Sequence, residues 1–141
     1  MAAPVSIRAF ESGDMGAVID LLQDVSVYRP AANTIPKLAG EFLNQENAYG
    51  CVAIHNGNLI GFGSIFILNR LRGGSSAIVE DVVVAASMRG QGVGKAVLNA
   101  LTEFAAARDC FKVTLEASPR AERFYFASGF CPSGRVMKLM L

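Results

Sequence analysis

Three glycines within five positions, Gly90, Gly92 and Gly94, stand at the start of a stretch whose apolar residues follow a helical spacing. Each glycine inside a helical turn costs about 1 kcal/mol relative to alanine, so the backbone freedom of this segment needs a reason. The glycines follow the strand-like run "AIVEDVVV", and from Val93 onward the apolar positions 93, 97, 98, 101, 104 and 105 share one helix face. A strand, a glycine-rich turn and a helix N-terminus therefore come in direct succession.

Such a turn is suited to binding an anion. Amide NH groups in the first turn of a helix lack partners within the helix, and the helix dipole places about half a positive charge there. Where Cβ atoms are absent an anionic ligand can approach the backbone closely. We therefore predict a phosphate- or pyrophosphate-binding turn made of Arg89, Gly90, Gln91, Gly92, Val93, Gly94 and Lys95, in which the two basic side chains add full positive charges.

The spacing excludes two common nucleotide-binding motifs. A P-loop needs four residues between its glycines and a Ser or Thr after its lysine, whereas only residues 91–93 separate Gly90 from Gly94, and Ala96 follows Lys95. A dinucleotide fingerprint G-x-G-x-x-G would need its third glycine where Lys95 stands. The turn therefore belongs to another class of phosphate-binding loop.

The rest of the chain predicts a single domain, residues 1–141, because 141 residues with 52% apolar composition can close one hydrophobic core but not two. Asn56-Gly57 suits the two positive φ angles of a type I′ hairpin turn between two strand-like runs. Helical patterns begin near residues 15, 35, 93 and 119, and strand-like patterns cover 5–10, 49–68, 77–84, 111–117 and 136–141. This order predicts a mixed α/β (α+β) sheet covered by helices.

The charge balance limits the classes of binding partner that we expect. Thirteen Lys and Arg against twelve Asp and Glu give a formal charge of +1, so we expect neither nucleic acid nor a membrane surface as a partner. No apolar run approaches the roughly 20 residues that span a bilayer, and the first residues lack a signal-peptide pattern, so we expect a cytoplasmic protein. One histidine and three scattered cysteines give little support for a metal site, and no metal is expected.

The pattern R-x-x-G-x-G, present from Arg89 to Gly94 and separated from "EDVVV" by residues 85–88, resembles the pyrophosphate loop of the GCN5-related N-acetyltransferase (GNAT) superfamily. Within that superfamily "IVEDVVV", "CFKVTLEAS" and "FYFASGF" are similar to strings of the glucosamine-6-phosphate N-acetyltransferases, in the same order from Ile78 to Phe130. Ala121 departs from a frequent Asn, and "LNRLR" departs from the charged stretch that ends the third strand in those enzymes. The resemblance implies one GNAT domain whose mostly antiparallel sheet of six to seven strands is flanked by four helices and splayed between strands four and five.

The resemblance also implies acetyl-CoA as co-substrate and direct attack of a primary amine on its thioester. The backbone of Val82, Val83 and Val84 can pair with the amides of the pantetheine arm as an added strand. By resemblance, an NH near Val82 or Val83 faces the thioester carbonyl. Tyr125 matches a family tyrosine that protonates the departing thiolate, and a phenol of pKa ~10 can share a proton with a thiol of pKa ~8.5.

Two acidic residues, Glu80 and Asp81, interrupt an apolar strand, and a period of two predicts that their side chains point to opposite faces. Glu80 matches a family acid near the substrate amine, and is predicted to take the amine proton or to hold the ammonium group. Glu116 is a second candidate of the same kind. The alternative interpretations are a solvated charge at a strand end for Glu80 and core packing for Tyr125.

Basic residues near the acceptor site are predicted to bind a substrate phosphate. Arg70 and Arg72 precede the strand that carries Glu80, and Arg135 precedes the apolar segment "VMKLML". The alternative is that these arginines are solvated surface charges. The resemblance further implies a homodimer, for which "VMKLML" is apolar enough to form part of the interface.

Three functions follow as hypotheses. The first is an acetyl-CoA-dependent N-acetyltransferase acting on a small-molecule amine, with an amino-sugar phosphate as one candidate acceptor. The second is a module that binds acyl-CoA without turnover. The third is an acetyltransferase of a protein or peptide amine, which predicts an open acidic or apolar groove in place of a compact basic pocket.

Overall fold

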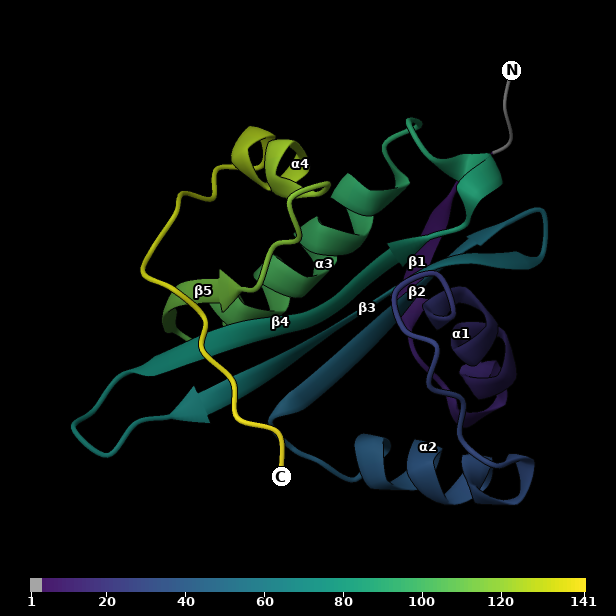
Figure 1. Cartoon of the computed structure of the whole chain (residues 1–141), viewed down its shortest axis with the longest axis horizontal. Coiled ribbons are helices and arrows are strands. Elements are labelled where there is room, and N and C mark those ends of the chain that lie inside the picture. Colours follow the sequence, from purple (N-terminus) through teal and green to yellow (C-terminus); the bar gives the residue numbers. More distant parts are fainter. Residues whose placement is uncertain (1–3) are drawn as a thin grey trace.

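The computed structural model describes residues 4–141 and places one twisted sheet between two layers of helices (Figure 1). The strands follow one another across the sheet in chain order: β1 (Ser6–Ala9), β2 (Ala48–His55), β3 (Asn58–Asn69), β4 (Ser75–Val84) and β5 (Cys110–Leu115). Neighbouring strands are antiparallel except for β4 and β5, which are parallel. A parallel pair needs a crossover connection, and here a helix provides it.

Two helices cover each face of the sheet. Helices α1 (Met15–Leu22) and α2 (Ile35–Leu43) lie on one face, and α3 (Val93–Ala107) and α4 (Glu122–Ala127) lie on the other (Figure 1). The side chains of α3 that are buried follow the spacing predicted from the sequence: Val93, Val97, Leu98, Leu101 and Ala105. Short 3₁₀ turns, Ser12–Asp14, Ala32–Thr34 and Ala86–Met88, lead into α1, α2 and the glycine turn.

The sheet separates two hydrophobic clusters. On the α3 face, Ile65, Val79 and Leu101 are central and 4% exposed or less. On the α1 and α2 face, Phe10, Val52 and Phe62 pack together, and the Phe10 ring meets both Phe42 and Phe62 edge to face. Burial of this apolar area on both faces is the main force that holds the helices to the sheet.

The predicted hairpin is confirmed. Asn56 has φ 51° and Gly57 has φ 75°, the two left-handed residues of a type I′ turn. Its strands β2 and β3 lie at the centre of the sheet. Within the part of the chain that the structure describes, no helix is long and apolar enough to cross a membrane.

Strands β4 and β5 pair over only part of their length. Their contacts run from Ser75 to Val79 on β4, and β4 then continues to Val84 with no partner on that side. This confirms the predicted splay between the fourth and fifth strands. Beside the glycine turn this edge of β4 therefore has no partner strand, and an extended ligand can pair with it there.

The expected count of six to seven strands is wrong for the described residues, which contain a five-stranded sheet. Residues 136–141, predicted as the last strand, form no strand and are exposed. They pair with no strand of the sheet, although β5 is an edge strand, so alternation of residue types alone does not create pairing. Helix α4 is also shorter than the predicted helix that began at residue 119.

Candidate active site

The three glycines have two different structural roles. Gly90 and Gly92 have φ angles of 77° and 83°, in the left-handed region that favours glycine. A Cβ atom at either position would meet nothing within 4 Å, so the backbone there faces open space. Gly94 has ordinary helical geometry, but a Cβ there would lie 3.3 Å from the Phe124 ring of α4. The turn therefore offers unshielded amides, and Gly94 lets α4 pack closely beside them.

A groove of about 830 Å³ runs from the glycine turn along the unpaired part of β4. Every residue predicted to bind the cofactor except Gln91 lines it: Val82, Val83, Val84, Arg89, Gly90, Gly92, Val93, Gly94 and Lys95. The Gln91 amide turns away and donates to the Ser87 carbonyl oxygen at 3.5 Å. The predicted residues thus form one continuous surface, as a phosphate site next to an open strand edge requires.

Apart from Tyr125 on α4 (Glu122–Ala127), sequence reasoning missed the residues of this groove that come from other elements. Asp24 and Val25 follow α1, and Arg120, Phe124 and Ser128 lie in or beside α4. A basic residue two positions before α4 is a signal that could have indicated Arg120. No local signal indicates Asp24, because only the fold brings it to Arg89, 65 positions along the chain.

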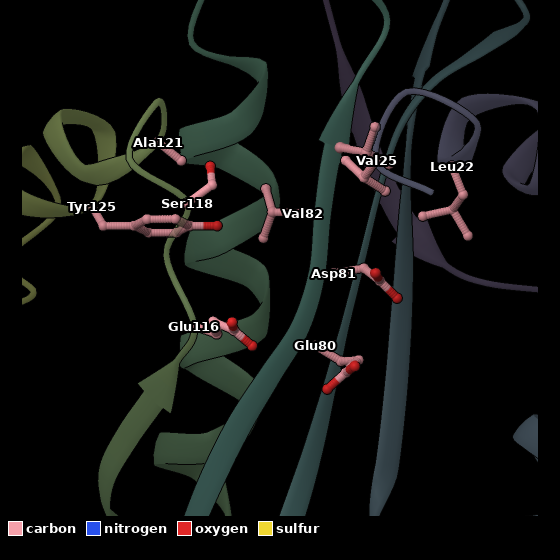
Figure 2. A pocket seen from close by; sticks show the side chains of 10 residues that line it. Leu22, Val25, Glu80, Asp81, Val82, Glu116, Ser118, Ala121 and Tyr125 are labelled. Carbon is pink, nitrogen blue, oxygen red and sulfur yellow. The ribbon is translucent and has the colours of Figure 1, made fainter. Parts of the chain in front are cut away.

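A second, smaller cavity of about 260 Å³ adjoins the groove (Figure 2). Three carboxylates line it, those of Glu80, Asp81 and Glu116, together with the Ser118 and Tyr125 side chains. Among residues 4–141, no group of three His, Cys, Asp or Glu side chains is placed to hold a metal ion. Because three carboxylates line it, the cavity is an acidic site, suited to binding a protonated amine.

The two carboxylates of β4 do not point to opposite faces, which corrects the prediction from strand alternation. The pairing of β3 with β4 is interrupted between Ser64 and Ile65, which face Asp81 and Val79, so Glu80 is the extra residue of a β-bulge. In Figure 2, Glu80 and Asp81 lie on the side of β4 that faces Leu22, and Val82 lies on the other side. A bulge breaks the period of two, and both carboxylates line the small cavity.

Asp81 is the more enclosed carboxylate of this pair. Its Oδ2 accepts a hydrogen bond from the Ser64 hydroxyl at 3.3 Å, and Ser64 is 2% exposed. Burial raises the pKa of Asp81, and the Ser64 hydrogen bond partly opposes that rise. Glu80 and Glu116 are exposed at the mouth of the cavity.

Tyr125 stands where the two cavities meet. Val25, Val82, Val83, Ser118 and Ala121 line both cavities with it. Its ring packs edge to face against Phe124 and Phe130, and Figure 2 shows the hydroxyl directed towards Val82 on β4. Burial and the negative charge of Asp81 raise the pKa of Tyr125, so the phenol stays protonated at neutral pH.

The arginines predicted to bind a substrate phosphate lie outside both cavities. Among the described residues, no Arg, Lys or His lines the small cavity, so the expected compact basic pocket is wrong for this chain. The Arg70 guanidinium lies over the Phe111 ring, 5.8 Å from its centroid, and Arg72 and Arg135 are exposed. The small cavity is compact as expected for a small acceptor, but its charge is acidic.

Comparisons with known proteins agree with this geometry. Residues 18–130 match the acetyltransferase (GNAT) family. A glucosamine 6-phosphate N-acetyltransferase of Trypanosoma brucei brucei is 29% identical over 141 residues, which cover 97% of this chain and 96% of that protein. A glucosamine 6-phosphate N-acetyltransferase of Oryza sativa subsp. japonica is 38% identical over 85 residues, 59% of this chain and 52% of the relative.

The fold comparison extends over the whole chain. The crystal structure of glucosamine-6-phosphate N-acetyltransferase from Arabidopsis thaliana superposes with a TM-score of 0.89 at 25% identity, covering 97% of this chain and 98% of that one. The match over residues 18–130 includes the glycine turn, the splayed strands and Tyr125. This chain therefore belongs to the acetyltransferase (GNAT) family, and it is an N-acetyltransferase.

Proposed function

We propose that this N-acetyltransferase transfers the acetyl group of acetyl-CoA to the primary amine of an amino-sugar phosphate, with glucosamine 6-phosphate as the acceptor. The observation that carries the proposal is the junction of the two cavities at Tyr125. A long groove beginning at open backbone amides meets a small acidic cavity there, which is the arrangement a donor thioester and an acceptor amine require. The names of the relatives from Trypanosoma and Oryza support the choice of acceptor.

The donor occupies the larger groove in this proposal. Its pyrophosphate accepts hydrogen bonds from the free amides of residues 90–95, between the side chains of Arg89 and Lys95. Its pantetheine amides pair with the backbone of residues 82–84, since β4 has no partner strand on that side. The left-handed Gly90 and Gly92 fit this ligand, because a side chain at either position would project into the open space beside the amides.

The acceptor amine occupies the smaller cavity. Protonated amines predominate at neutral pH, and Glu80 and Glu116 attract the ammonium group and orient it. Glu80 then receives a proton from it, directly or through water, because only the neutral amine has a lone pair for attack. The cavity of about 260 Å³ suits a sugar amine better than a peptide chain.

Acetyl transfer then proceeds by direct attack. The amine nitrogen forms a bond to the thioester carbon, and a main-chain NH of Val82 or Val83 donates to the carbonyl oxygen as it gains negative charge. The carbon–sulfur bond breaks, and Tyr125 gives its proton to the sulfur. The nitrogen loses its second proton in the same step, which restores the phenol. The products are an N-acetylated amine and coenzyme A.

The substrate phosphate lies outside the small cavity in this proposal, because three carboxylates line that cavity. Arg70, Arg72 and Arg135 are the candidates to hold it.

We also propose that the protein forms a homodimer through its C-terminal segment, where Val136, Met137, Leu139, Met140 and Leu141 are exposed. Light scattering on the full chain and on a chain ending at residue 135 tests this; a full-length monomer would contradict it.

A thiol-release assay tests the proposed acceptor. We expect coenzyme A to be released from acetyl-CoA with glucosamine 6-phosphate, more slowly with glucosamine, and not with lysine-containing peptides. Release with peptides alone would show instead that the protein acetylates a protein or peptide amine. Binding of acetyl-CoA without release of coenzyme A, whichever amine of a test panel is added, would favour a module that binds acyl-CoA without turnover.

A further inference from the structure

A buried serine in the middle of β3 donates a hydrogen bond to one of the carboxylates that line the acidic cavity. The stretch "GFGSIFIL" is apolar apart from Ser64, and a hydroxyl buried in such a strand needs a hydrogen-bond partner. Ser64 is 2% exposed, and it donates to Asp81 Oδ2 at 3.3 Å across the β3–β4 pair. The two residues face each other in the register directly beside the bulge at Glu80. The bulge and the hydroxyl together fix where the Asp81 carboxylate lies.

The surroundings of Asp81 contain only neutral and acidic groups. Three other titratable residues line the same cavity as Asp81: Glu80 on β4, Glu116 in the segment after β5, and Tyr125 on α4. The α1 side contributes Leu22 and Val25. No residue of the described chain that lines this cavity is basic, so the Ser64 hydroxyl is the side-chain donor that stabilises the ionised carboxylate.

We propose that Ser64 is a positioning residue that keeps the Asp81 carboxylate ionised and oriented for the ammonium group of the acceptor. The bond to Ser64 engages Oδ2 and leaves Oδ1 for the substrate. This inference rests on the proposed function, because it assigns Asp81 to the amine-binding cavity. It adds a third anionic group to Glu80 and Glu116, and it explains why a polar residue stands in an apolar strand.

The pH dependence of kcat/KM tests the pair, measured with the best acceptor of the amine panel. Loss of the Ser64 bond raises the pKa of Asp81 further, because that bond favours the charged form. In Ser64→Ala the acid limb, the low-pH side of the plot of kcat/KM against pH, therefore moves to higher pH. At a given pH on that limb kcat/KM falls about 10-fold, as expected for the loss of one hydrogen bond to a charged group. Ser64→Thr, which keeps the hydroxyl, restores the wild-type limb.

Two controls separate this role from general damage to the fold. Ser76→Ala makes the same change at a serine of β4 that is 3% exposed and lines neither cavity, and it leaves the acid limb in place. In an Asp81→Asn background, Ser64→Ala causes no further movement of the limb. An unmoved limb in Ser64→Ala, an equal movement in Ser76→Ala, or a movement that persists without Asp81 would each overturn the proposal.

A direct titration distinguishes failure of this proposal from failure of the proposed acceptor. Carbon NMR of carboxyl-labelled aspartate in the substrate-free protein follows Asp81, which Asp81→Asn identifies. A higher pKa of Asp81 in Ser64→Ala than in wild type supports the pair even where glucosamine 6-phosphate is not acetylated. An equal pKa in both proteins overturns the pair even where that sugar is the acceptor.

Discussion

The guanidinium of Arg89 lies 3.1 Å from the carboxylate of Asp24, a residue 65 positions earlier in the chain. The same side chain donates through Nε to the Val84 carbonyl oxygen at 3.3 Å. Arg89 therefore joins three elements of the groove: the segment after α1, the end of β4 and the glycine turn. Asp24 also lines the groove, so it brings a negative charge to the place where we propose that the pyrophosphate binds.

Asp24→Asn is expected to tighten coenzyme A binding. The substitution keeps the size of the side chain and frees Arg89 to interact with phosphate oxygens. Both partners are about half exposed, so the gain is small, roughly two- to fivefold in Kd at low salt. Isothermal titration calorimetry measures it. Asp20→Asn is the matched control, because Asp20 pairs with Arg29 and lines neither cavity. Weaker binding in Asp24→Asn alone would mean that the ion pair holds the groove in its binding shape.

Substitution of Gly92 tests the proposed phosphate site. Gly92→Asn and Gly92→Asp both place a short polar side chain at a φ of 83°, which these residues tolerate better than others. They differ by one negative charge. Two unit charges about 4 Å apart at an effective dielectric of 20 interact by about 4 kcal/mol. We therefore expect coenzyme A affinity to fall roughly 100- to 1000-fold further in Gly92→Asp than in Gly92→Asn. Equal affinities in the two variants would place the pyrophosphate elsewhere.

The glycine turn could be predicted from the sequence because its signals are local. Glycines, a flanking Arg and Lys, a preceding strand and a following helix all lie within residues 77–105, and each signal follows from backbone geometry. The Asn56-Gly57 hairpin was predictable for the same reason. The residues of such turns specify their backbone conformation without reference to distant parts of the chain.

The acidic cavity could be predicted only in part, because it depends on contacts between distant segments. Alternation along "IVEDVVV" predicted Glu80 and Asp81 on opposite faces, and the bulge against β3 placed them in one cavity. Bulges depend on the partner strand, so a single strand's sequence does not reveal them. Residues 136–141 matched a strand pattern, but a strand also needs pairing with a neighbour, and in the structure they pair with none of the five strands.

Tyr125→Phe tests the proposed acid. The variant keeps the ring and its packing against Phe124 and Phe130 and removes only the hydroxyl. We expect kcat to fall by about 10- to 1000-fold, with coenzyme A affinity nearly unchanged. Tyr49→Phe is the control, because it removes a hydroxyl from a ring that stacks on Phe104 and lines neither cavity. Wild-type turnover in Tyr125→Phe would assign Tyr125 to packing alone.

The pH dependence of kcat carries a second test of Tyr125. A phenol donates its proton only while it is protonated, so activity that depends on it is present below its pKa and lost above it. Burial and Asp81 raise the pKa of Tyr125 above the usual 10.0. Activity lost through ionisation of Tyr125 therefore declines only above pH 10. A decline well below pH 10 that Tyr125→Phe abolishes would contradict this assignment.

Phosphate on the acceptor is expected to improve its acetylation, although the amine cavity itself is acidic. Without a basic partner outside the cavity, Glu80, Asp81 and Glu116 would repel a phosphorylated sugar and favour glucosamine. If the arginines bind the phosphate, kcat/KM for glucosamine 6-phosphate exceeds that for glucosamine by roughly 10- to 100-fold, as expected for one or two charge-assisted contacts. The advantage then shrinks in the single alanine variants of Arg70, Arg72 and Arg135, and it is unchanged in Lys37→Ala on α2, which lines neither cavity.

Salt dependence gives a second measurement of phosphate binding. Since salt screens charges that are exposed to solvent, KM for the phosphorylated sugar also rises between low and physiological ionic strength, and KM for glucosamine rises less. Equal rates for the two sugars, with a salt-insensitive KM, would exclude phosphate recognition by these arginines. The acceptor would then be recognised through its amine by the carboxylates of the small cavity alone.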